Sequence, residues 1–238
     1  MAKINLLTPN PWLKVGKGKD KIADCDRYWL SDQGKTLLQY AQDINTKNSG
    51  IEIDFSCFPD PFCGNPNSKV YCLNKNPGKP DPCFLWSAAF KQGTIKNLQL
   101  DQATCFWAEK IINKCGKVHA GIDWMTKRTK QIESILGRHP NIFFIEYFPY
   151  HSTKGFVFPN CLPSYYFSNE LIMKAMEEEK LIIIMREKKN WLERIHDLKS
   201  YPNLCVLKYP QGGYLTPNNI VRYKSKKVLT NAEFKKYF

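Results

Sequence analysis

The stretch Ser168-Asn-Glu-Leu-Ile-Met-Lys-Ala-Met-Glu-Glu-Glu-Lys-Leu-Ile-Ile-Ile-Met185 joins a helical pattern directly to an apolar run. Apolar side chains between Leu171 and Met176 recur at helical spacing, which predicts an amphipathic helix over 168–180. The following run, 181–185, is apolar throughout, as is typical of a short strand buried on both faces. A helix that leads straight into such a strand is half of a crossover unit.

The same alternation continues on both sides of this stretch. Toward the C-terminus we expect a helix over 189–198 and a strand over 204–207, and toward the N-terminus strands over 69–73 and 142–147 that flank a helix over 127–138. Strands joined through helices run parallel, and the helices cover both faces of their sheet. The sequence therefore predicts an α/β fold, a three-layer α/β/α sandwich with a central, mainly parallel sheet.

The length of 238 residues suits one large domain, and no linker rich in proline, glycine and serine divides it. We expect a single domain over 1–238 with its core over 61–225, wrapped by an irregular, aromatic segment over 1–60. No apolar run approaches the ~20 residues needed to span a bilayer. The N-terminus lacks the apolar segment of a signal peptide. A cytoplasmic monomer without membrane contact is expected.

The chain is strongly basic. Lysine and arginine number 35 against 22 aspartate and glutamate, giving a net charge of +13. Such an excess favours a polyanionic partner, DNA above all, because each phosphate contact releases condensed counterions. The alternative is a solubilising surface with no specific partner.

Nine cysteines are scattered without a Cys-x-x-Cys pair. An odd number without a signal peptide indicates reduced, mostly buried thiols. We therefore expect no metal site and no cofactor.

Polar loops shaped by proline and glycine follow three of the predicted strands. They are Cys72-Leu-Asn-Lys-Asn-Pro-Gly78, Glu146-Tyr-Phe-Pro-Tyr-His-Ser152 and Tyr209-Pro-Gln-Gly-Gly-Tyr-Leu-Thr-Pro-Asn-Asn219. Ligands of open parallel sheets bind beyond the carboxyl ends of the strands, so we expect the three loops to converge on one crevice. Each loop alone is equally an ordinary turn, because proline fixes φ and glycine permits positive φ.

Together these loops resemble the uracil-DNA glycosylase superfamily over about residues 60–225. The segment 70–78 resembles the first motif, which reads Gly-x-Asn-Pro-Gly in the single-strand-selective and mismatch-specific branches. Ile145-Glu-Tyr-Phe-Pro149 is similar to the base-reading segment Asn-Tyr-Cys-Pro, and 207–219 occupies the place of the His-Pro-Ser motif and its DNA-inserting loop.

This resemblance implies roles for the first motif. Asn76 would position the attacking water, and the turn at Pro77 and Gly78 would let the backbone approach the base. Phe84 or Trp86 would stack on the base. An asparagine in place of the aspartate of the best-known uracil branch implies a slower reaction, since an amide is no base at neutral pH.

Glu146 stands where the family reads the base with asparagine. A carboxylate only accepts hydrogen bonds, so it suits the exocyclic amine of cytosine better than uracil. A modified cytosine, such as the glucosylated hydroxymethylcytosine of phage DNA, is the substrate this implies, since some superfamily members act in bacterial defence. The alternative is that Glu146 caps a loop or pairs with a lysine.

The third loop departs from the family at Tyr209, where the leaving-group histidine is expected. His151 is the alternative source of an imidazole. Tyr214 and Leu215 are candidate wedge residues for base flipping. Thr216 is expected to cap a short helix whose N–H groups bind phosphate. The full set of expected DNA contacts is Gln211, Gly212, Gly213, Tyr214, Leu215, Thr216 and Asn218.

The sequence thus predicts a monofunctional DNA glycosylase that leaves an abasic site, because no lysine is placed as a Schiff-base nucleophile. Three alternatives stay open: uracil removal in base-excision repair, a non-catalytic DNA-binding relative, and a small-molecule or nucleotide-binding α/β protein.

Overall fold

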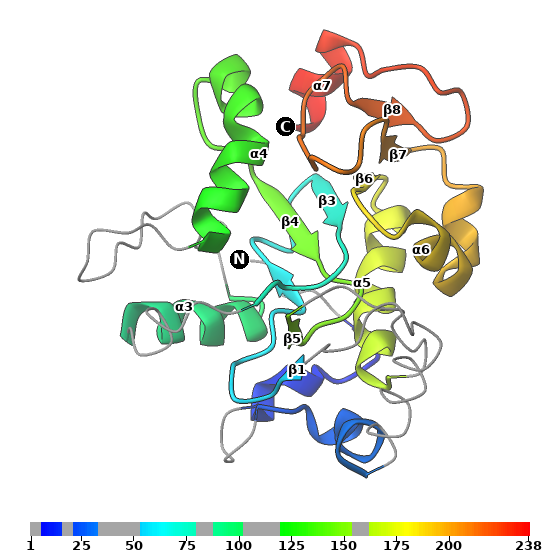
Figure 1. Cartoon of the computed structure of the whole chain (residues 1–238). Helices are drawn as coiled ribbons and strands as arrows, with labels where there is room; N and C mark the ends of the chain where they lie inside the picture. Colours follow the sequence, from blue (N-terminus) through cyan, green and yellow to red (C-terminus); the bar gives the residue numbers. More distant parts are fainter. Residues whose placement is uncertain (1–5, 16–20, 33–52, 80–87, 102–119, 154–161) are drawn as a thin grey trace.

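The computed structural model describes residues 6–15, 21–32, 53–79, 88–101, 120–153 and 162–238. A six-stranded sheet in the order β2-β4-β3-β6-β7-β8 forms its centre (Figure 1). The strands are β2 (Phe62–Cys63), β3 (Val70–Leu73), β4 (Ile142–Ile145), β6 (Leu181–Ile184), β7 (Leu204–Leu207) and β8 (Ile220–Arg222). The four central strands run parallel, and β2 and β8 are antiparallel edges. The predicted mainly parallel sheet is confirmed.

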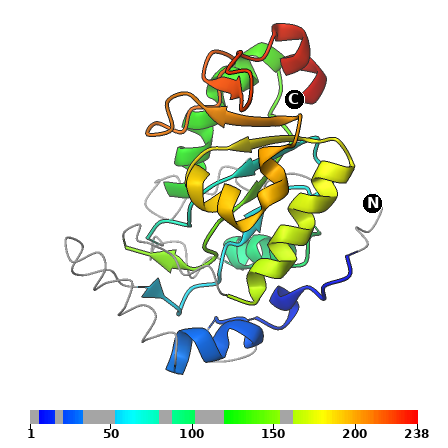
Figure 2. The same ribbon diagram turned by 90° about the vertical axis from the view of Figure 1, so that its right-hand side faces the viewer.

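Helices cover both faces of this sheet. They are α3 (Ala88–Leu98), α4 (Ala120–Leu136), α5 (Ser164–Glu177), α6 (Lys188–Arg194) and α7 (Asn231–Tyr237). One face, with Tyr71 and Ile182, packs against α5 and α6, and the other, with Cys72 and Ile183, packs against α4 and α7. Figures 1 and 2 show these layers on opposite sides of the strands. Burial on both faces explains why the central strands are apolar throughout.

The chain leaves the two middle strands in opposite directions. After β3 it passes through α4 to β4, and after β6 it passes through α6 to β7 on the other side. The loops beyond β3 and β6 therefore diverge. In open α/β sheets, such a divergence is where ligands bind.

The described residues before the sheet form short single-turn helices and one small strand. They are η1 (Pro11–Lys14), η2 (Asp24–Asp26), the π-helix η3 (Tyr28–Asp32) and β1 (Ile53–Asp54). Strand β1 pairs antiparallel with β5 (His151–Ser152), outside the six-stranded sheet. The 3-10 helix η6 (His196–Lys199) follows α6.

Asp26 ties this segment to the core. Its side chain is fully buried, where Oδ1 accepts a hydrogen bond from the backbone N–H of Ser164 at 2.9 Å and Oδ2 accepts one from Tyr150 at 2.8 Å. The Tyr150 hydroxyl in turn accepts the N–H of Ala23 at 3.1 Å. Burial raises the pKa of Asp26, although these hydrogen bonds oppose the shift. Because Asp26 satisfies its first N–H, helix α5 begins four residues before the predicted Ser168.

Several sequence-based boundaries are corrected. No helix begins at Thr216: residues 217–219 form a turn in which the Ile220 N–H bonds the Thr216 carbonyl, and the chain continues as β8. Helix α4 starts well before Lys127 and ends before Gly137, whose φ of +68° stops it. The chain beyond 225 also enters the core, where Phe234 of α7 is buried.

The cysteines are mixed in state. Cys25, Cys57, Cys72 and Cys205 are free, but Cys63 is disulfide-bonded, so the expectation of reduced thiols is wrong there. Within the described ranges, no helix is long and apolar enough to cross a membrane.

The Asp26 contact generates a stability prediction. Tyr150→Phe leaves the Ala23 N–H and one Asp26 oxygen buried without a partner, so the free energy of unfolding should fall by about 1–3 kcal/mol. Urea unfolding measures this. Tyr166→Phe, at a side chain that is 70% exposed, is the matched control and should change little. Equal stability of both variants would contradict the proposed importance of the contact.

Candidate functional site

Two polar side chains meet where β3 and β4 end. Asn74 follows β3 and donates from Nδ2 to Oε1 of Glu146, which follows β4, at 2.9 Å. The Asn74 backbone is fixed as well: its N–H bonds the Ile145 carbonyl at 2.8 Å, and its carbonyl accepts Trp191 Nε1 at 2.8 Å. Glu146 was predicted as a site residue. Asn74, its direct partner, was missed although it stands in the quoted motif.

Glu146 carries a carboxyl group with an unused oxygen. Oε2 is buried and has no hydrogen-bond partner among the described residues. Burial raises the pKa of Glu146 to about 8; the Asn74 hydrogen bond opposes this, the Asp60 charge adds to it, and His151 and Arg186 oppose it. At neutral pH the carboxyl is therefore mostly protonated, and it both donates and accepts. The prediction that Glu146 only accepts hydrogen bonds therefore applies only above about pH 8, where the carboxyl is ionised.

Asn76 is half-buried in the turn that follows. Its Nδ2 donates to Ser152 Oγ at 2.9 Å and to the Pro77 carbonyl at 2.7 Å. Its Oδ1 accepts no hydrogen bond from the described residues, so it is the atom available to a water or ligand. Gly78 is exposed, and a Cβ there would meet nothing within 4 Å. The protein itself thus does not require glycine at that position.

His151 lies beside this turn on β5. Its Nδ1 is 2.7 Å from the Gly78 carbonyl, and its Nε2 is 3.4 Å from Asp60 Oδ2. Burial lowers the pKa of His151, but Asp60 and the Gly78 carbonyl raise it by more, so the net shift is upward. Both ring nitrogens are therefore engaged when the ring is protonated. His151 fastens the turn to Asp60, and the prediction that it donates directly to a leaving base is not supported by this geometry.

The end of β6 adds a charged pair that sequence reasoning missed. Lys75 Nζ lies 2.7 Å from Glu187 Oε1, and Asn190 Nδ2 donates to the other carboxylate oxygen at 2.8 Å. Glu187 starts α6 in the left-handed region, at φ 56° and ψ 37°. A non-glycine residue there is strained, and these contacts hold it. Its position three residues after a buried strand was the available signal.

Loop 209–219 is closed by Asn219. Its Oδ1 accepts the Tyr209 N–H and its Nδ2 donates to the Tyr214 carbonyl, each at 2.7 Å. Arg186, just after β6, donates to the Gln211 carbonyl at 2.8 Å and so connects the loop to the strand ends. Tyr209 is 62% exposed, and within the described residues no hydrogen bond joins its side chain to Asn76 or Glu146.

The two candidate wedge residues of this loop differ in burial. Leu215 is fully buried, and its N–H bonds the Arg128 carbonyl of α4, so the prediction of a wedge there is wrong. Tyr214 is 49% exposed. A Cβ at Gly212 would lie 2.5 Å from the Tyr214 ring, so a larger residue there would displace this half-exposed side chain, and Gly213 has a φ of +64°, which favours glycine. Asn218 is exposed.

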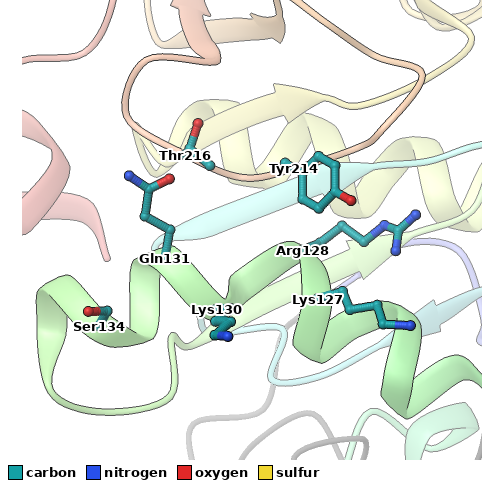
Figure 3. Close-up of a pocket in the computed structure, with 7 residues that line it drawn as sticks. All are labelled: Lys127, Arg128, Lys130, Gln131, Ser134, Tyr214 and Thr216. Atoms are coloured by element: carbon teal, nitrogen blue, oxygen red, sulfur yellow. The ribbon is translucent and has the colours of Figure 1, made fainter.

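A groove of about 360 Å³ lies between this loop and α4 (Figure 3). Its lining residues are Lys127, Arg128, Lys130, Gln131, Ser134, Tyr214 and Thr216. The predicted single crevice is thus divided: Asn76, Glu146 and His151 gather at the ends of β3 and β4, whereas the loop lines the separate groove. Phe84 and Trp86 lie outside the described residues.

Comparison with protein-family models, curated proteins and solved structures finds no match to this chain. In the described part of the chain, no group of three or more histidine, cysteine, aspartate or glutamate residues could hold a metal ion.

The buried carboxyl makes stability depend on pH. The pKa of Glu146 is about 8 in the folded protein against an ordinary 4.5, so between these values only the unfolded chain releases the proton. The free energy of unfolding should therefore fall as pH rises through this window. Glu146→Gln should flatten that fall in urea unfolding measured at about pH 5 and pH 8. Glu177→Gln, at an exposed position, serves as the control. Parallel profiles for wild type and Glu146→Gln would contradict the assignment.

Proposed function

We propose that this protein is a monofunctional DNA glycosylase with a uracil-glycosylase-like fold, acting on a flipped base with a cytosine-type edge. The observation that carries the proposal is the buried Oε2 of Glu146, which lacks a partner within the described residues. The other oxygen of this carboxyl accepts from Asn74, which stands two positions before Asn76 in the same loop. A buried polar atom without a partner is costly unless a ligand pairs with it. The net charge of +13 favours a polyanionic partner, and this supports DNA as the molecule that brings the ligand to Glu146.

Base recognition follows from the protonation state of Glu146. A neutral carboxyl offers one donor and one acceptor, which match N3 and the N4 amine of cytosine. The same pair also matches the O4 and N3–H of uracil, so uracil is the second candidate substrate at neutral pH. Once ionised, Glu146 only accepts and favours cytosine. Normal cytosine must be spared, so a substituent on the base supplies the selectivity, as in modified phage DNA.

Bond cleavage needs a positioned water and a stabilised leaving group. Loss of the base leaves an oxocarbenium-like sugar, and Asn76 orients the attacking water through Oδ1, which accepts no hydrogen bond from the described residues. The departing base carries negative charge. Arg186 is a cation whose charge acts on Glu146, and in this proposal it stabilises the departing base in place of Tyr209 or His151. His151 is a positioning residue that holds the Asn76 turn.

The proposal includes no strand cleavage. Lys75 is the lysine of the first motif, and its ammonium is held by Glu187 at 2.7 Å. This contact engages Nζ, whereas a Schiff base requires an amine that is free to attack the sugar. The product is an abasic site.

Release of free base tests the activity. The full chain is incubated with modified phage DNA, uracil-containing DNA and normal DNA, and the supernatant is analysed by mass spectrometry. We expect one released base from modified or uracil-containing DNA and alkali-labile sites in the same strand. Binding without any released base would favour the non-catalytic alternative, and no salt-dependent binding would favour a small-molecule protein.

Substitutions of Asn76 and Glu146 separate the roles of these two residues. Asn76→Ala should reduce the single-turnover rate by about 10²-fold with little change in DNA affinity, because it removes the water's anchor. An unchanged rate would remove Asn76 from the mechanism.

Glu146→Gln keeps one donor and one acceptor at every pH. The preference of wild type for cytosine-type over uracil bases should rise between about pH 7 and pH 9, as the carboxyl with a pKa of about 8 ionises, whereas that of Glu146→Gln should stay flat. Competition between two labelled oligonucleotides measures this ratio. A wild-type ratio that does not change with pH would show that Glu146 does not contact the base.

A further inference from the structure

The groove between α4 and loop 209–219 is basic and lies on the α4 side of the sheet. Lys127, Arg128 and Lys130 occupy one stretch of α4, and Tyr214 and Thr216 face them from the loop (Figure 3). Neither Asn76 nor Glu146 lines this groove. It is therefore a surface distinct from the strand-end site.

The cations of the groove are only partly neutralised. Lys127 pairs with Asp123 at 2.6 Å, whereas Lys130 and Arg128 form no ion pair with the described residues. Arg128 lies 4.6 Å from the Trp124 ring, and its buried Nε has no acceptor in that same part of the chain. Gln131 and Ser134 add side-chain hydrogen-bonding groups. Such a surface suits a ligand that carries repeated negative charge.

Tyr214 adds a flat aromatic surface. Its ring lies 5.5 Å from the Arg128 guanidinium, so one side of it is held against a cation. Gly212 leaves the space that the ring occupies, and Asn219 fixes the Tyr214 carbonyl. The residue is still half exposed. A supported, exposed tyrosine beside cations is the arrangement on which unpaired nucleobases stack.

Arg186 connects the loop that lines the groove to the strand-end site through one hydrogen bond. It donates to the Gln211 carbonyl of the loop, and its charge acts on both Arg128 and Glu146.

We infer that the groove binds a single strand of DNA, with phosphates on Lys127 and Lys130 and an unpaired base stacked on Tyr214. This binding is independent of base excision, because no group of the strand-end site takes part in it. A free phosphate or mononucleotide shares the ligand chemistry but uses only part of the groove.

Fluorescence anisotropy with a labelled oligothymidine of about 20 nucleotides tests the assignment. This DNA carries no base of the proposed substrate, so the result does not depend on glycosylase activity. Lys130→Gln should weaken binding several-fold and reduce the slope of log affinity against log salt by about 0.7. Tyr214→Leu should weaken binding about tenfold through lost stacking. Lys199→Gln, an equally exposed lysine in η6, is the matched control and should bind as wild type does.

Competition distinguishes the possible occupants. Unlabelled oligothymidine should displace the probe at far lower concentration than pyrophosphate, thymidine monophosphate or fully paired duplex. Equal potency of the mononucleotide would overturn the strand assignment in favour of a small-anion site, and preference for duplex would overturn the stacking on Tyr214. Wild-type binding by both groove variants, with unchanged thermal unfolding, would overturn the inference entirely.

Discussion

Complete burial of the central strands is the constraint on which the rest of this structure depends. Strands β3 and β6 have neighbours on both sides and helices on both faces, so every side chain within them is buried, and the Tyr71 hydroxyl is accommodated there by donating to the Pro66 carbonyl. The charged and amide side chains stand instead in the residues that follow each strand. Asn74, Glu146 and Arg186 come together because parallel strands end at the same edge, and there they share one electrostatic environment.

That environment is built from groups that modify one another. Removing the Glu146 carboxyl from water favours its neutral form, and the nearby cations only partly offset this effect. The pKa of His151 is also raised, because Asp60 and the Gly78 carbonyl outweigh the effect of burial. Two titratable groups with raised pKa values thus lie near each other, and the shift favours the neutral form of Glu146 but the protonated form of His151.

The local sequence pattern predicted the strands more accurately than it predicted the segments that flank them. The runs at 70–73 and 204–207 are visible because an apolar stretch between turn residues has few other interpretations. Strand β8 was missed because Thr216 and its proline also fit a helix start. The start of α5 depends on Asp26, which is distant in sequence, and no local pattern contains it. Among the site residues, Glu146 and Asn76 were predicted from motifs, whereas Asn74, Arg186 and Glu187 take their importance from contacts made only in the fold.

The side chain of Asn219 has a consequence for how loop 209–219 meets a partner. It is bonded to the loop at its start and again at Tyr214, so the loop closes on itself and has little freedom to open like a hinge. The ordering of this segment has already been completed during folding. A molecule that docks there meets a preorganised surface and loses less conformational entropy than it would against a mobile loop.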